Sequence, residues 1–434
     1  MRVGDQVSGS RPYDVAVVGG GIIGCACAFN LRRAGLGVLL IDRGVPSNAA
    51  SWGNAGHFAY GEVLPLATPA LWAQMPRLLL ARHSPLRIPL SSFWTLAPWL
   101  ARFAGNTRPS QVERATSALA SLLAPAPAAW RRLAEAAHLT DLIRASPLLV
   151  VARSQAALVS KRPSIEVSRR HGTVIDEIST SEARQIEPLI RPDVAGAFVY
   201  RQAQYTTDPA KLTRRLKEAY VEAGGHAALD DIGMLEASGD GTVKVGSWVA
   251  RQCVIAAGIG SRDILKSIGL DIPLAAERGY HIMVPYVDGQ PTVRTPIIGA
   301  KPEFVITPMD EGVRLAGTVE IVREDAAPRW QRARMLKALA EQIIQPIGEP
   351  SDESKWVGCR PSLPDSLPAI GRIARAPGVI AAFGHQHLGL TMAAVTAEIV
   401  AALVQLKGAP VRMEEPFAVE RFFNSGRRAP PKAG

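Results

Sequence analysis

The alternation of apolar and polar positions predicts a strand, a helix and a second strand at the start of the chain. Residues 14–19, DVAVVG, form a short apolar run, and residues 24–37 carry apolar positions at helical spacing. Gly35 and Gly37 end that helix, and residues 38–43, VLLIDR, form the next apolar run. Strand, helix and strand in succession make a βαβ unit, so the pattern predicts an α/β fold with a parallel sheet.

Later segments predict one more helix and three more strands. Residues 206–225 have helical spacing, with Asp208 as N-cap, Pro209 at the first helical position and Gly224 at the stop. Runs rich in β-branched and aromatic residues predict strands at 196–204, 280–287 and 313–322.

Three consecutive glycines join the first strand to the first helix. Gly19, Gly21 and Gly24 fit the pattern G-x-G-x-x-G, and Asp42 follows at the tip of the second strand. Here the first glycine permits a tight turn, the second lets a pyrophosphate approach the helix N-terminus, and the third lets helix and strand pack closely. Asp42 is placed to accept hydrogen bonds from ribose hydroxyls. The pattern predicts dinucleotide binding, since a purely structural glycine turn would leave Asp42 unexplained.

Composition narrows the classes of partner. The chain has 434 residues, 47% hydrophobic and 20% charged, which is enough for two cores. The formal net charge of +10 would attract anions. No basic run carries interleaved aromatic residues, and no zinc-finger or helix-turn-helix spacing occurs, so we do not expect nucleic acid as a partner. The four cysteines show neither zinc-ligand spacing nor a disulfide pattern, and no metal is expected.

Four stretches together carry a family resemblance. Residues 47–61 are rich in Ser, Ala, Asn and Gly, which suits a backbone that wraps a bulky ligand. The other three are CVIAAGIGS from 253, GCRPSLPDSLPAIGR from 358 and AAFGHQHLGLTMAAV from 381. With these the sequence resembles, over nearly its whole length, the FAD-dependent amine oxidoreductases of the D-amino acid oxidase superfamily. Within that superfamily it resembles the bacterial D-amino acid dehydrogenases.

The resemblance implies FAD as cofactor. It places the N-terminus of the last helix at the flavin pyrimidine ring, where a helix N-terminus stabilises negative charge. We expect non-covalent FAD, because Cys359 is one residue out of register with the flavin-linked cysteine of sarcosine-oxidising relatives, and His57 is out of register with the histidine used by dimethylglycine-type relatives. The implied FAD contacts are Gly19, Gly21, Ile22, Ile23, Gly24, Asp42, Arg43, Ser51, Asn54, Ala55, Gly56, Ala257, Gly258, Gly384, His385, Leu388, Gly389, Leu390 and Thr391.

The resemblance also implies two interleaved domains, so that the chain is α/β in its cofactor domain and α+β overall. A Rossmann-like FAD-binding domain is expected from residues 1–62, 201–270 and 350–434. A substrate domain built on an antiparallel sheet plus helices is expected from residues 63–200 and 271–349.

Three residues are the candidate catalytic residues. Arg360 occupies the position at which related enzymes hold a substrate carboxylate, a task for which a planar guanidinium is suited; the alternative is a structural ion pair. Tyr280 resembles a residue beside the substrate, and the alternative is a tyrosine packed in a sheet. His387 stands where some relatives carry a second arginine, and both His385 and His387 either line the site or cap the turn.

The expected activity is dehydrogenation of a D-amino acid by hydride loss from the α-carbon. The loop at 51–67 looks more like the subgroup acting on D-proline or D-hydroxyproline than like the general D-alanine enzymes. Alternatives are a sarcosine or glycine oxidase that uses oxygen, a flavin-dependent tRNA-modification enzyme, and a non-catalytic flavin subunit. The expected electron acceptor is a quinone or an electron-transfer protein.

Residues 63–112 contain no Asp or Glu, while Arg77, Arg82, Arg87 and Arg102 alternate with aromatic and aliphatic residues. One interpretation is a set of buried helices with surface arginines. The other is a basic amphipathic patch that contacts a membrane through 70–104. With no apparent signal peptide or bilayer-spanning run, we expect a cytoplasmic protein, peripheral on the inner face of the cell membrane under the second interpretation.

Overall fold

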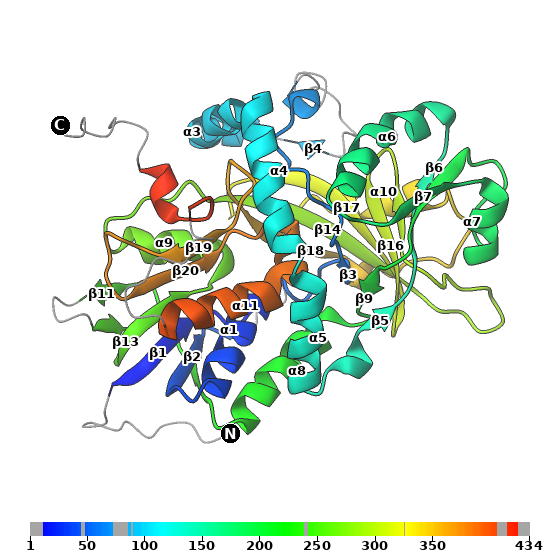
Figure 1. Ribbon diagram of the computed structural model, residues 1–434. Helices are drawn as coiled ribbons and strands as arrows, with labels where there is room; N and C mark the ends of the chain where they lie inside the picture. Colours follow the sequence, from blue (N-terminus) through cyan, green and yellow to red (C-terminus); the bar gives the residue numbers. More distant parts are fainter. Residues whose placement is uncertain are drawn as a thin grey trace.

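The computed structural model describes residues 12–44, 48–72, 86–87, 90–237, 242–324, 326–405 and 415–423, with the backbone only at 86–87 and 90–93. Two large sheets organise these residues (Figure 1). The first contains the predicted βαβ unit, and the second is mainly antiparallel. The predicted mixed fold is therefore confirmed.

The first sheet has its parallel strands in the order β10-β2-β1-β13-β20. Short antiparallel strands extend it beside β13 and β20. Its strands are β1 (Tyr13–Val18), β2 (Val38–Asp42), β10 (His226–Leu229), β11 (Leu235–Ala237), β12 (Val243–Val245), β13 (Trp248–Ile255), β19 (Ala369–Arg372) and β20 (Val379–Phe383).

Side-chain alternation along β1 shows how the two faces of this sheet are covered. Val15 and Val17 pack into one core with helices α1 (Ile22–Arg33), α8 (Pro209–Glu222) and α11 (Gly389–Gln405). Ala16 and Val18 pack into the other, beside β11, β12 and α9 (Ser261–Lys266). Burial on both faces is what a central parallel strand requires. As predicted, the Asp208 side chain caps α8 by accepting from Lys211 N–H.

The second sheet runs in the order β18-β14-β17-β16-β15-β6-β8-β7, with β4 (Leu86–Arg87) beside β17. The predicted strands at 196–204, 280–287 and 313–322 all lie in or next to it. Its members are β6 (Leu148–Ala152), β7 (Ile175–Ile178), β8 (Gly196–Tyr200), β14 (Ala275–Pro285), β15 (Ile297–Gly299), β16 (Phe304–Met309), β17 (Gly312–Val322) and β18 (Trp356–Ser362). A small third sheet joins β3 (His57–Phe58), β9 (Gln204–Tyr205) and β5 (Arg144–Ala145).

Alternation along β14 separates the two faces of the second sheet. Tyr280, Ile282 and Val284 point into a core closed by α10 (Gln331–Ala340). Glu277, Gly279 and His281 therefore point to the opposite face. We call this the loop face, because it meets the loop at residues 51–56.

Two segments pack differently from the expected division into domains, which otherwise stays a prediction. β18 lies in the expected cofactor segment 350–434, yet it pairs with β14 in the second sheet. Helices α4 (Pro109–Leu123) and α5 (Ala126–Ala136) lie in the expected substrate segment, yet they pack against α11 in the core of the first sheet (Figure 1). Three further helices are α3 (Leu90–Asn106), α6 (Gln155–Arg170) and α7 (Thr180–Ile186).

Two helices are relevant to the expectations about a membrane-spanning segment and a membrane contact. Residues Gln386–Gln405 are long and apolar enough to span a bilayer, with mean hydropathy 1.7, which corrects the expectation that no such segment exists. This stretch is 67% buried and packs on α1 and α5, as a core helix does. In α3, Leu96, Trp99 and Phe103 are buried, which agrees with the interpretation of this region as buried helices with surface arginines. The membrane contact stays a prediction, and Arg77 and Arg82 lie outside the described residues.

Candidate active site

The glycine turn lies at the carboxyl edge of the first sheet. Gly19 has φ +111°, and a Cβ there would come within 2.4 Å of the Ala256 carbonyl oxygen. A Cβ on Gly24 would lie 1.8 Å from the Gly19 carbonyl oxygen. The turn therefore requires glycine at position 19. The close approach of α1 to the turn requires glycine at position 24.

Asp42 and Ser51 complete a cradle around this turn. The Asp42 carboxylate accepts hydrogen bonds from the N–H groups of Gly20 and Gly44, one on each oxygen. Ser51 Oγ accepts from Ile22 N–H at 3.0 Å, at the first turn of α1. Each carboxylate oxygen keeps a lone pair, so Asp42 can also accept from ribose hydroxyls. A helix N-terminus and an acid at the adjacent strand end fit the two halves of a dinucleotide.

The other predicted cofactor residues follow the ends of neighbouring parallel strands. Because β1, β2, β13 and β20 run parallel, the turns after them meet at one edge of the sheet. The turn after β1 leads into Ile23, and Arg43 follows β2. The turn after β13 contains Ala257 and leads into Gly258, and the turn after β20 contains Gly384 and leads into Leu388. Arg43 is exposed, and Leu388 and Leu390 are buried. At the start of α11, which begins at Gly389, Thr391 Oγ1 accepts from Ala59 N–H at 2.9 Å.

Three consecutive carbonyl groups in the loop 51–56 are held by the loop face of the second sheet. His281 Nδ1 donates to Gly53 O at 2.9 Å, and Arg314 Nη1 donates to Asn54 O at 2.7 Å. Thr307 Oγ1 donates to Ala55 O at 2.8 Å. These three hydrogen bonds hold the loop, with the predicted cofactor residues Asn54, Ala55 and Gly56, against three adjacent strands.

Burial lowers the pKa of both His281 and Arg314, but only His281 loses its charge at neutral pH. Burial, and then the charge of Arg314, lower the pKa of His281 to about 3, so the ring is neutral. Burial lowers the pKa of Arg314 to about 10, which leaves the guanidinium charged at neutral pH. Among the described residues, no carboxylate lies within ion-pair distance of Arg314.

Arg360 lies on the loop face of β18 and pairs with a buried carboxylate. Its Nη1 donates to Glu277 Oε1 at 3.0 Å, and Ser362 Oγ donates to Glu277 Oε2 at 3.1 Å. The guanidinium covers Gly279, where a Cβ would come within 2.5 Å of Nη2. Arg360 keeps 26% of its side-chain exposure, while Glu277 keeps 2%. The expected alternative of an ion pair is therefore present, and about a quarter of the Arg360 side chain stays exposed.

Tyr280 does not line this site, which corrects its candidate catalytic role. It is 1% exposed and points to the α10 face, where its hydroxyl donates to Glu320 Oε2 at 2.8 Å. The same hydroxyl accepts from Arg329 N–H. The period of two along β14 places Tyr280 opposite to Gly279 and His281. The packed-tyrosine alternative describes it correctly.

The two histidines of the GHQH turn have different environments. His385 is 4% exposed, its Nε2 is 3.0 Å from Thr396 Oγ1, and burial lowers its pKa to about 3. His387 instead reaches Glu62, with Nε2 at 3.0 Å from Oε2. Burial lowers the pKa of His387, but the hydrogen bond and charge of Glu62 outweigh it and raise the pKa. His385 is therefore buried against α11, whereas His387 pairs with Glu62, and its role beside the substrate stays a prediction.

Glu62 joins His387 to a second histidine. His57 Nε2 lies 3.8 Å from Glu62 Oε1. Burial raises the pKa of Glu62, but the interactions with both histidines outweigh it and hold the pKa well below its usual range. Sequence reasoning missed Glu62, Glu277 and Gly279. Glu62 had a signal, as it is the sole acidic residue between Asp42 and Glu113.

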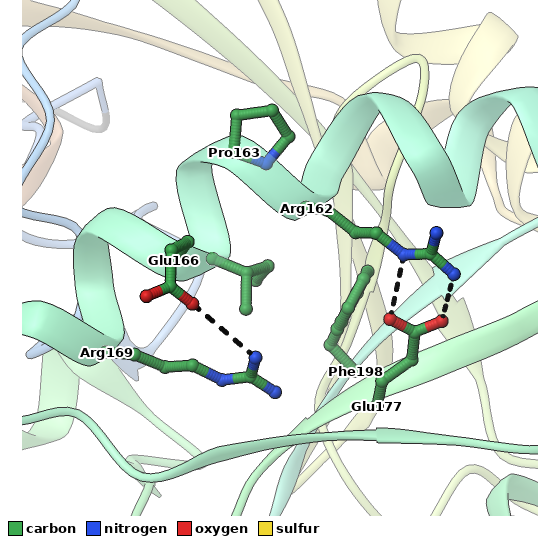
Figure 2. A pocket seen from close by; sticks show the side chains of 7 residues that line it. Arg162, Pro163, Glu166, Arg169, Glu177 and Phe198 are labelled. Carbon is green, nitrogen blue, oxygen red and sulfur yellow. Dashed lines mark hydrogen bonds and ion pairs between the residues drawn. The ribbon is translucent and has the colours of Figure 1, made fainter.

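A separate pocket lies between α6 and the strands β7 and β8 (Figure 2). Figure 2 shows its charged side chains paired with one another: Arg162 with Glu177 at 2.7 Å, and Arg169 with Glu166 at 3.8 Å. It shares no residue with the site described above. These paired charges leave no group directed at a ligand.

Comparisons with known proteins agree with this geometry. The family model described as FAD dependent oxidoreductase matches residues 14–403. A D-amino-acid oxidase of Bradyrhizobium diazoefficiens is 33% identical over 420 residues, covering 94% of this chain and 99% of that protein. A D-amino acid dehydrogenase of Xylella fastidiosa is 26% identical over 401 residues, covering 90% and 91%. The structure of glycine oxidase from Geobacillus kaustophilus aligns with TM-score 0.70 at 22% identity, covering 95% and 99%, and shows the same fold.

Proposed function

The chain belongs to the family of FAD-dependent oxidoreductases, and on that premise we propose that it dehydrogenates D-amino acids at the α-carbon. FAD, when bound, would supply the hydride acceptor for this oxidation. The cradle of Gly19, Asp42 and Ser51 fits the dinucleotide part of FAD, and the fastened loop at 51–56 lies beside it. The names of the two curated relatives support a D-amino acid as substrate.

The observation that carries the proposal is the partial exposure of the Arg360 side chain, at 26%. Its Nη1 is taken by Glu277, which fixes the plane of the guanidinium above Gly279. The remaining N–H groups offer a fork for a carboxylate, and a fork sets orientation as well as affinity. Arg360 would thereby hold the α-carbon in one position relative to the flavin.

We also propose that the preferred substrate is D-proline or D-hydroxyproline, and that electrons pass to a quinone or an electron-transfer protein. The loop at 51–67 supports the first proposal by its resemblance to that subgroup. On α3, Trp94 is 83% exposed, and Trp72 nearby in sequence is 42% exposed. Exposed tryptophans favour a membrane interface, which supports an acceptor located in the membrane.

A substrate panel tests the proposed function. The purified holoenzyme is assayed with D- and L-amino acids, sarcosine and glycine, using an artificial dye and measuring peroxide in parallel. We expect dye reduction with D-amino acids, strongest with D-proline or D-hydroxyproline, and little peroxide. Peroxide formation equal to dye reduction would identify an oxidase, and preference for sarcosine or glycine would overturn the substrate proposal.

Replacing Asp42 by Ala weakens FAD binding. The variant loses a charged acceptor for the ribose hydroxyls, at a cost of about 1.5–3 kcal/mol, or roughly a ten- to hundredfold rise in the Kd for FAD. Fluorescence titration of the apoprotein with FAD measures the change. Asp193→Ala, which removes an exposed ion pair with Arg191, serves as the control. Unchanged FAD affinity in the Asp42 variant would place the ribose elsewhere.

Acid precipitation of the purified protein releases the flavin into the supernatant. Cys359 pairs with Arg278 in the β14–β18 register, so its side chain points to the face opposite Arg360. A thiol there is turned away from the loop face that meets the cradle. Absorbance of the supernatant and pellet at flavin wavelengths measures the distribution. Flavin that remains with the pellet contradicts the expectation of non-covalent binding.

A further inference from the structure

Glu62, His57 and His387 form a group that the proposed function leaves without a role. We call these three residues the Glu62 cluster. They come from separate parts of the fold: His57 from β3, Glu62 from the loop after it, and His387 from the turn before α11. In the part of the chain that the structure describes, no group of three or more His, Cys, Asp or Glu residues is placed to hold a metal. The cluster therefore needs a different explanation.

One side of the Glu62 carboxylate has an unfilled hydrogen-bonding position. Oε2 is occupied by His387 at 3.0 Å, whereas Oε1 is 3.8 Å from His57 Nε2, too far for a hydrogen bond. Both ring nitrogens of His57 are buried and find no hydrogen-bond partner among the residues that the structure describes. A buried polar group without a partner is costly, and it indicates a missing donor or acceptor. A ligand N–H group near Oε1 and the His57 ring would fill this position.

The side chains of the cluster differ in exposure. Glu62 keeps 38% of its side-chain exposure, compared with 13% for His57 and 33% for His387. The Glu62 side chain is therefore the most exposed of the three. It is also ionised, because the two histidines stabilise its charge. An accessible ionised carboxylate selects a cation or another strong N–H donor.

The Glu62 cluster neighbours the proposed carboxylate anchor. The charge of Glu277 raises the pKa of His387, and the charge of Arg360 lowers it. In the backbone, Ser362 at the end of β18 forms a bridge with His385, two residues before His387. The carboxylate and the amino group of an α-amino acid are bonded to the same carbon, so their two binding groups must be neighbours. Arg360 and Glu62 are both linked to His387, and they offer opposite charges for these two groups.

We propose that Glu62, with His57 beside it, binds the α-amino group of the substrate. This inference rests on the proposed function in taking an α-amino acid as the substrate. Glu62 Oε1 accepts an N–H from the ammonium or from the neutral amine, and Arg360 holds the carboxylate. With two substituents of the α-carbon fixed, only one enantiomer directs its hydrogen toward the flavin. His387 holds Glu62 in place and is a positioning residue.

Calorimetry with a matched ligand pair tests the inference on the holoenzyme. 2-Aminoisobutyrate has no α-hydrogen and cannot be oxidised, and isobutyrate has the same skeleton without the amino group. We expect the unmodified protein to bind 2-aminoisobutyrate more tightly. Glu62→Gln should weaken 2-aminoisobutyrate binding by about ten- to a hundredfold, as for loss of a hydrogen bond to a charged group. Isobutyrate affinity should stay unchanged or rise, because a repelling negative charge is removed.

Two further variants separate recognition from structure. Glu62→Asp keeps the charge and should restore part of the preference for 2-aminoisobutyrate. Glu398→Gln removes a carboxylate paired with Arg132 on the surface and should change neither affinity. The inference is overturned if the unmodified protein does not prefer 2-aminoisobutyrate, or if Glu62→Gln weakens both ligands equally or neither. Failure of the proposed function would show separately, as absent oxidation of every D-amino acid in the substrate panel.

Discussion

Replacing Arg360 by Lys lowers kcat/KM for D-amino acids by roughly thirty- to a thousandfold, equivalent to a loss of about 2–4 kcal/mol in transition-state stabilisation. Lysine keeps a positive charge beside Glu277 but cannot present two parallel N–H groups to a carboxylate. The α-carbon then loses its fixed orientation, so kcat falls as well as affinity. Steady-state kinetics with a dye acceptor measures both parameters, and we expect FAD content to stay unchanged.

Amine substrates provide the contrast for this variant. An amine that lacks the carboxylate should be nearly indifferent to Arg360→Lys. Arg132→Lys is the matched control, because Arg132 forms a two-pronged contact with Glu398 on the surface. If amino acids and amines lose activity equally, or if the Arg360 variant loses FAD, Arg360 is a structural residue and the proposed substrate class loses its main support.

Replacing Gly279 by Ala lowers kcat/KM by about a hundredfold without unfolding the protein. The new methyl group would come within 2.5 Å of Arg360 Nη2 and 2.8 Å of Cζ, so the guanidinium must move. A displacement of about 1 Å in a positioning group costs on the order of a hundredfold in rate. The clash involves the end of a flexible side chain, so the backbone can stay in place.

Thermal melting and FAD content accompany the kinetics of the Gly279 variant. Gly105→Ala is the matched control, since a Cβ at Gly105 in α3 has no atom within 4 Å. That control should keep full activity and gain up to about 1 kcal/mol of stability from helix propensity. Full activity in Gly279→Ala would show that the position of the Arg360 guanidinium does not control the reaction.

The cofactor side of the fold could be predicted from sequence because its signals are local. The glycine turn, the N-cap of α8 and the strand ends each lie within a few residues. Parallel pairing of β1, β2, β13 and β20 then brings these strand ends to one edge, as the βαβ pattern implies. A family resemblance was still needed to connect the stretches at 253 and 381 with the first 60 residues.

The substrate side could be predicted less well because it depends on pairing between distant strands. The alternation in residues 277–281 separates Glu277 and Gly279 from Tyr280, but does not say which set faces the site. That choice follows from α10, which covers the face bearing Tyr280. The contact of Arg360 with Glu277 likewise arises from the β14–β18 register, across 83 residues of sequence.

The fastening of three loop carbonyls by His281, Arg314 and Thr307 has a consequence for protein engineering. The strands β14, β16 and β17 that supply these donors belong to the same sheet as β18, which carries the proposed carboxylate anchor Arg360 and is a natural target for changing substrate specificity. Substitutions there can loosen the loop and lower flavin occupancy even when they improve the fit of a new substrate. A mutant library screened by activity alone would discard such variants. Screening with added FAD would recover them, because excess cofactor compensates for weaker binding by mass action.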